Sequence, residues 1–219
     1  MKKNYGVLFG VIIAIAVVSI GTILANPNIP TNKIKATFDS LKSMDKSIAN
    51  VVLVESDDFV ILKNDFVFYK ENLKLIQDMG KGSFQLPSDN EIINIMIAKK
   101  VGANYAKSLG ITVTKEELDE QITFQKETLE EESVTGETNH LIKEIMKHRI
   151  EMTGLSPDEF WNSKDVREEY EEEILISKLM AMLIEKEKIA NVQEFDEFIH
   201  KEIVDKSVNK ITIKTELFN

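Results

Sequence analysis

The sequence predicts a mostly helical protein: an N-terminal transmembrane helix, then a multi-helix core with a small β element. Three observations predict this class. Residues 6–25 form an uncharged and mainly apolar run. Most of the remaining chain repeats apolar residues at helical spacing between capping signals. Short stretches of β-branched or alternating residues occur near residues 50–63 and at the C-terminus, as is typical of strands.

Composition excludes several classes of function. The chain has 219 residues, and 27 Lys and Arg against 37 Asp and Glu give a net charge of −10. A nucleic-acid partner is not expected, because binding phosphates requires a basic surface. There is no cysteine, which excludes disulfides, thiolate zinc sites and a cysteine nucleophile. No catalytic motif stands out, so we expect no catalytic residue, no cofactor and no metal.

The N-terminus predicts the compartment. A helix over residues 6–25, "GVLFGVIIAIAVVSIGTILA", would be about 30 Å long, the thickness of a bilayer core. Lys2 and Lys3 precede it, so we expect a cytoplasmic N-terminus and an extracytoplasmic remainder. The alternative is a signal peptide cleaved after Ala25, followed by secretion. Ile23 is a poor residue for such a cleavage site, so we favour a single-pass anchor in the cell membrane.

The predicted domain division has three parts: residues 1–25 as anchor or signal segment, 26–49 as spacer and short helix, and 50–219 as helical core. Residues 26–33 hold two prolines and three asparagines, which indicates an extended spacer. Residues 34–49 are open to interpretation, and a helix lying across the core is one reading.

The first part of the core contains two capped helices. Asn64 or Asp65 can begin a helix that ends before Gly80, and Ser88 or Asp89 can begin the next. The latter carries an apolar residue at every fourth position and ends at a glycine. The members of this stripe are Ile93, Ile97, Val101, Tyr105 and Leu109, followed by Gly110.

Further capping signals follow. Thr114 and Glu117 form a capping box, and Ser156 and Glu159 form a second one with Pro157 at the first helical position. Other predicted helices are 139–153, about 164–188 with an apolar middle, and about 192–206. The terminal stretch "NKITIKTELF" alternates and predicts a strand. A lone strand leaves its backbone groups unpaired, so we expect it to pair with residues 50–63 in one small sheet.

The order of four segments resembles the SurA/PrsA foldase family. They are "FVILKNDFVFYKENL", "YAKSLGITVTKEELDEQI", "GLSPDEFW" and "REEYEEEILISKLMAMLIE", and the resemblance covers about residues 59–190. It implies a SurA N-terminal, trigger-factor-like chaperone core that binds unfolded or newly exported polypeptides in an apolar cradle without ATP. Relatives of the PrsA type also carry a lipid-anchoring cysteine and a parvulin isomerase domain. This chain has no cysteine, and only "EKEKIANVQE" stands where the parvulin would be, so we infer that isomerase activity is absent.

Flexible methionines and neighbouring aromatic residues are the candidate client-binding residues, because adaptable apolar side chains suit varied partners. Ordinary core filling is the competing interpretation. The predicted set is Met96, Met146, Ile150, Met152, Phe160, Trp161 and Met180.

Other features and functions remain as alternatives. His140, Glu144 and His148 can share a helix face, but we interpret them, like the acidic clusters 130–132 and 168–173, as solvated side chains. The alternative functions are an anchored assembly module with one dedicated partner and an isomerase-family foldase. Both a monomer and a homodimer are compatible with the sequence.

Overall fold

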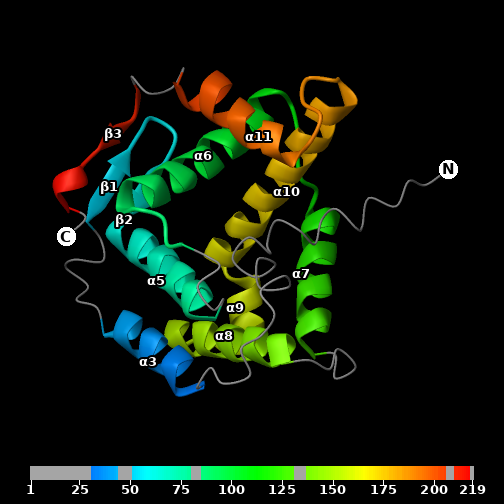
Figure 1. The fold of residues 1–219 in the computed structure, drawn as a ribbon. Coiled ribbons are helices and arrows are strands. Elements are labelled where there is room, and N and C mark those ends of the chain that lie inside the picture. Colours follow the sequence, from blue (N-terminus) through cyan, green and yellow to red (C-terminus); the bar gives the residue numbers. More distant parts are fainter. Residues whose placement is uncertain (1–30, 44–50, 80–84, 131–136, 206–209, 218–219) are drawn as a thin grey trace. The chain divides into compact units, whose positions relative to one another are not determined.

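The computed structural model describes residues 31–43, 51–79, 85–130, 137–205 and 210–217. These residues are mostly helical and include a three-stranded antiparallel sheet, which confirms the predicted fold class at this level (Figure 1). The chain divides into two compact units, and each is described by itself. Unit 1 comprises residues 1–44, 71–86 and 114–171, and unit 2 comprises residues 45–70, 87–113 and 172–219.

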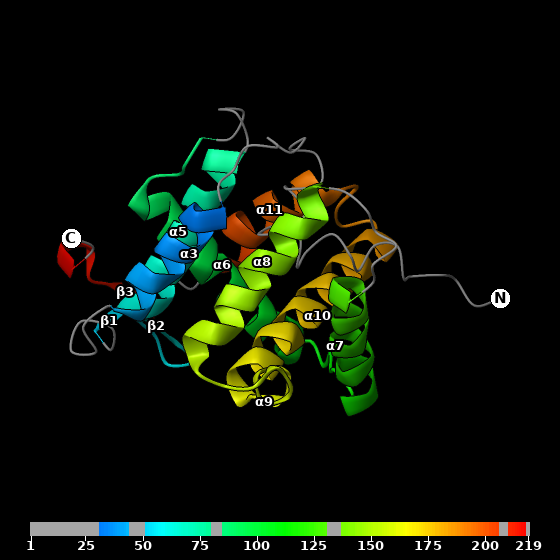
Figure 2. The same ribbon diagram turned by 90° about the horizontal axis from the view of Figure 1, so that it is seen from below.

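The first described helix of unit 1 is α3 (Thr31–Lys42), which lies along helix α8 (Glu137–Thr153) (Figure 2). Ile34, Phe38 and Leu41 are buried at i, i+4 and i+7, so one face of α3 belongs to the core of this unit. The helix read for residues 34–49 is present over residues 34–42 and already starts at Thr31, within the predicted spacer, while residues 44–49 lie outside the described residues.

Two of the remaining helices of unit 1 begin at the predicted capping boxes, and two helices end before the predicted glycines Gly80 and Gly154. The remaining helices are α7 (Lys115–Glu130), α9 (Pro157–Asn162) and the first part of α10 (Lys164–Glu185), together with residues 71–79 of α5. The Thr114 N–H donates to Glu117 Oε2 (2.8 Å), and the Glu117 N–H donates to Thr114 Oγ1 (3.2 Å). Ser156 and Glu159 form the second capping box, and Gly154 ends α8 with φ +74°.

Unit 2 contains the sheet, in the order β2-β1-β3. Strand β1 (Val52–Glu55) pairs antiparallel with β2 (Val60–Leu62) on one side and with β3 (Thr212–Ile213) on the other. The prediction that the C-terminal strand pairs with residues near 50–63 is confirmed. In Figure 1, β3 lies beside β1 although the two strands are far apart in the sequence.

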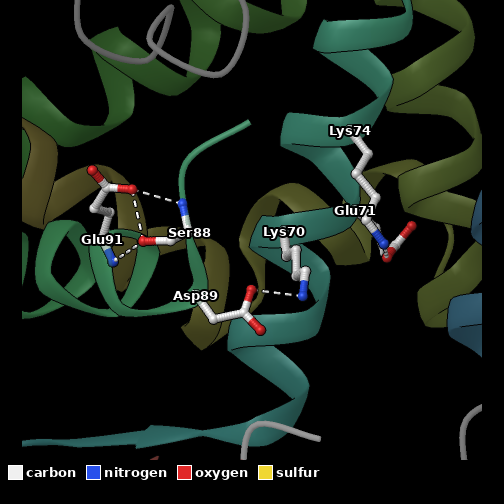
Figure 3. A network of polar contacts seen from close by, with 6 residues as sticks. All are labelled: Lys70, Glu71, Lys74, Ser88, Asp89 and Glu91. Carbon is white, nitrogen blue, oxygen red and sulfur yellow. Dashed lines mark hydrogen bonds and ion pairs between the residues drawn. The ribbon is translucent and has the colours of Figure 1, made fainter. Parts of the chain in front are cut away.

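The buried side chains of unit 2 are mostly Ile, Leu and Val. Its helical elements are the first part of α5 (Lys63–Met79), α6 (Asp89–Ser108), the second part of α10, α11 (Val192–Phe198), the π-helical turn η3 (Ile199–Val204) and the 3-10 turn η5 (Thr215–Leu217). Ser88 and Glu91 cap the start of α6, where Lys70 of α5 also pairs with Asp89 at 2.6 Å (Figure 3).

The predicted stripe of α6 is correct in its first half and wrong at its end. Ile93, Ile97 and Val101 are buried, whereas Leu109 is 45% exposed. A spacing of four residues advances about 40° beyond one full turn at each step. Over four steps this drift reaches about 160°, which carries Leu109 away from the core. Ala106 takes the buried position instead.

The acidic run 168–173 was predicted to be a solvated face. This prediction is wrong for Glu172 and Glu173, whose side chains are largely buried and paired with lysines. Glu172 pairs with Lys100 (2.6 Å) and Glu173 pairs with Lys99, and the two carboxylate side chains are only 18% and 15% exposed. Their basic partners lie on α6, about 70 residues away in the sequence, so spacing within the run could not reveal the pairing.

The predicted membrane anchor, residues 6–25, lies outside the described residues. Among the helices that the structure describes, none combines the length and apolar character needed to cross a bilayer.

Candidate client-binding surface

The predicted client-binding residues are divided between the two units. Five belong to unit 1: Met146, Ile150, Met152, Phe160 and Trp161. Met96 and Met180 belong to unit 2. Since each unit is described by itself, a single cradle lined by all seven stays a prediction.

Two of these residues form part of an aromatic cluster inside unit 1. Phe160 and Trp161 are 2% and 4% exposed, and their rings meet edge to face with centroids 5.4 Å apart. Trp161 also contacts Tyr170, at 6.1 Å between centroids, while the Arg149 guanidinium lies over the Phe160 ring at 5.6 Å. Trp161 and Phe160 therefore contribute to the core in this conformation and are not open to a client.

The three predicted client-binding residues on α8 are all half-buried, and their side chains point in two different directions. At about 100° per residue, Met146 and Ile150 lie about 40° apart, next to the exposed Lys147. Met152 points about 160° away from Ile150, close to the direction of His148. Met146 and Ile150 thus border the solvent side of α8, whereas Met152 belongs to the side that faces α3.

The side of α8 to which Met152 belongs is identified by His148, which contacts α3. Its ring stacks on Phe38 of α3, with centroids 6.2 Å apart, and its Nδ1 lies 2.9 Å from Glu151 Oε2. Its side chain is only 12% exposed, so the prediction of a solvated histidine is wrong here. His148 joins α8 to α3. The side chain of His140 is not among those described, and no metal-binding cluster occurs among the side chains that are.

Helix α7 carries an aromatic residue that the sequence analysis did not select. Phe124 is 52% exposed, while Leu118 and Ile122 of the same helix are buried. The signal was present: Phe124 lies outside the apolar stripe of α7, and an aromatic residue off the stripe of an amphipathic helix must face solvent or a partner.

Ion pairs hold α7 in place within unit 1. Lys126 of α7 pairs with Asp158 of α9 at 3.1 Å, and Asp119 of α7 pairs with Arg167 of α10 at 2.7 Å. Hydrogen bonds from Lys115 and Arg167 keep the pKa of Asp119 below its usual value, so this carboxylate is charged at neutral pH. The helix that presents Phe124 is thereby attached to two neighbours.

In unit 2, Met180 is 3% exposed and belongs to the core, whereas Met96 is half-buried on α6. Ile95, next to Met96 in the sequence, is 41% exposed. A shallow pocket of about 240 Å³ near α11 is lined by Lys188, Ile189, Glu194, Glu197, Phe198, Lys201 and Glu202. Its lining is largely charged and includes none of the predicted client-binding residues.

Comparison of the chain with protein-family models, curated proteins and solved structures finds no match. The resemblance to the SurA/PrsA family therefore rests on the sequence motifs alone.

Proposed function

We propose that this protein is a membrane-anchored, extracytoplasmic chaperone-like protein that binds unfolded or newly exported polypeptides without ATP. The observation that carries the proposal is Phe124, an exposed aromatic residue on a helix held by ion pairs. Helix α7 contacts α8 within unit 1, and α8 carries the half-buried side chains of Met146 and Ile150. Exposed apolar groups of this kind suit weak and broadly selective binding.

The energetics agree with a holding role. Burial of apolar client surface contributes about 25 cal/mol per Å², against which the ordering of a flexible client must be set. The remaining affinity is modest, so clients are released without an energy source. The acidic balance of the chain, −10 overall, adds attraction for basic segments of clients.

An aggregation assay tests the proposal. The full chain in lipid nanodiscs is mixed at a near-stoichiometric ratio with a reduced, unfolded client, and light scattering is followed. We expect suppression of aggregation, weakened by Phe124→Ser. The matched control is Val192→Ser, which removes an equally exposed apolar side chain from unit 2. No suppression at tenfold excess, or equal weakening by both variants, would contradict the proposal.

Cross-linking distinguishes a chaperone from an assembly module with one dedicated partner. A photo-reactive phenylalanine analogue at position 124 captures whatever contacts α7 in intact cells. Many unrelated exported proteins support the chaperone, whereas one stoichiometric protein supports the assembly module.

The anchor is tested separately. If residues 6–25 are an uncleaved anchor, the intact chain carries Lys2 and Lys3 by mass spectrometry and resists extraction from membranes by alkaline carbonate. A mature protein that begins near Asn26 would instead establish signal cleavage.

A further inference from the structure

The strand β3, which covers one edge of β1, is only two residues long. Its two residues are both exposed, with Ile213 at 37%. The Lys214 N–H donates to the Leu53 carbonyl at 2.9 Å, next to the paired residues Val54 and Ile213. A strand this short, with exposed side chains, contributes little apolar burial to its own attachment.

The other side of β1 is held much more firmly. Three residue pairs join β1 to β2, and the connecting turn is closed by Ser56. The Ser56 N–H donates to the Phe59 carbonyl, and the Ser56 hydroxyl accepts from the Phe59 N–H, both at 3.0 Å. Leu53 and Ile61 are almost fully buried. The hairpin is therefore closed by local interactions that do not involve β3.

The contacts of β3 define what this edge recognises. Ile213 lies opposite Val54, and opposite residues of an antiparallel pair project from the same face of the sheet. The Lys214 ammonium lies 3.8 Å from Glu55 Oε2. An edge that has lost β3 thus presents free backbone groups, an apolar position beside Val54 and a carboxylate for a cation.

We propose that β3 is displaceable, and that the edge of β1 it covers binds an extended peptide in which a β-branched or other apolar residue is followed by lysine or arginine. The peptide adds a strand to the sheet: main-chain hydrogen bonds provide affinity, and Val54 and Glu55 select the side chains. This inference rests on the proposed function, because the peptide is a segment of a client. The chain's own sequence "TIK" at 212–214 is the resident ligand.

A disulfide lock isolates this step. Because the Lys214 N–H rather than that of Ile213 donates to Leu53, Val54 and Ile213 form the closer, non-hydrogen-bonded kind of pair. Cα atoms of such a pair are roughly 4.5 Å apart, within the roughly 4.4–6.8 Å that a disulfide spans. The double variant Val54→Cys/Ile213→Cys carries the only two thiols, since the chain has no cysteine. Oxidation attaches β3 covalently, and reduction frees it in the same protein. Lys214→Pro serves if the first variant does not fold: it removes the N–H that donates to Leu53 and leaves the edge of β1 unchanged, so this variant should bind the peptide more tightly than the parent.

The readout is fluorescence anisotropy of a labelled peptide with the sequence NKITIKTE, added to the full chain in nanodiscs. We expect the reduced form to bind at least tenfold more tightly than the oxidised form. Replacing the second lysine of the peptide by proline, which removes the N–H that corresponds to Lys214, should abolish binding. Equal binding to both forms, or no binding to either at millimolar peptide, overturns the proposal. So does dimerisation on reduction, because the occupant is then a second copy.

The aggregation assay keeps the two proposals separate. If the oxidised form protects a client as well as the reduced form does, the edge of β1 is not the client site, while the chaperone proposal stands. If neither form protects a client but the peptide still binds the reduced form, the chaperone proposal fails and the peptide-binding edge stands.

Discussion

Two glycines of unit 2 should respond to the same substitution in opposite directions. Gly102 lies inside α6, where an added Cβ would be 3.5 Å from Ile199 Cδ1 and 3.9 Å from Ile176 Cγ1, which is ordinary van der Waals contact. Alanine is favoured over glycine in a helix by about 1 kcal/mol. We therefore expect Gly102→Ala to raise the free energy of unfolding by about 1 kcal/mol, or Tm by roughly 2–4 °C.

Gly110 differs because its backbone is left-handed, with φ +78°. Its N–H and that of Ile111 donate to the carbonyls of Lys107 and Ala106, which closes the C-terminus of α6. An alanine in this conformation costs about 1–2 kcal/mol, partly offset by about 0.4–1 kcal/mol from a less flexible unfolded chain. Gly110→Ala should therefore lower the free energy of unfolding by roughly 0.5–1 kcal/mol.

Urea unfolding followed by circular dichroism at 222 nm measures both variants, and hydrogen exchange of the α6 amides assigns the change to unit 2. Trp161, the only tryptophan, lies in unit 1 and reports on that unit separately. Gly102→Leu is the control that tests how much room the site has. Overpacking against Ile199 should lower its free energy of unfolding by about 1–3 kcal/mol. A Gly102→Ala variant less stable than the parent would refute the inference that the contact between α6 and η3 leaves room for a Cβ at position 102.

The remaining predictions concern caps and titrating groups. Thr114→Ala removes the N-terminal cap of α7. It should lower the free energy of unfolding by about 1 kcal/mol and increase hydrogen exchange in the first turn of that helix. Hydrogen bonds from the Ser156 side chain and backbone lower the pKa of Glu159, so this carboxylate stabilises the fold above pH 4.5, and its contribution is lost as the pH falls below that value. A Tm-against-pH profile in which Glu159→Gln shows the same acid slope as the parent would refute this. Burial raises the pKa of Tyr69 above 10.0, so its contribution is present below pH 10 and is lost as the pH rises through the folded-state pKa. Glu173→Gln should lower that pKa, which tyrosine absorbance at 295 nm or NMR would detect.

Local signals in the sequence predicted local structure well. Gly110, Gly154 and the capping boxes at Thr114 and Ser156 all lie where expected, because a cap needs only residues three or four positions apart. The pairing of the C-terminal strand was predictable for a different reason: an unpaired strand is costly, and few partners were available.

The candidate site was harder to predict, because it depends on which side chains other helices cover. Met180 and Met96 have similar local sequence environments, yet Met180 is buried and Met96 is half-buried. Phe124 was overlooked because the selection favoured methionines on apolar stripes, whereas an exposed aromatic residue lies off the stripe. A periodicity identifies the face that a helix buries; it does not identify which of its apolar residues remain available.

This distinction bears on how a client could bind. Exposing one buried side chain such as Trp161 costs about 1.5–3 kcal/mol, so an open form needed for its use would be populated roughly 10- to 150-fold less than the closed form. Affinity for a client would fall by the same factor. Binding to Phe124, Met146 or Ile150 requires no such opening, since Phe124 is already exposed and the other two are half-buried. Weak binding cannot absorb a large opening cost, so the chaperone proposal favours these residues over the buried aromatic cluster.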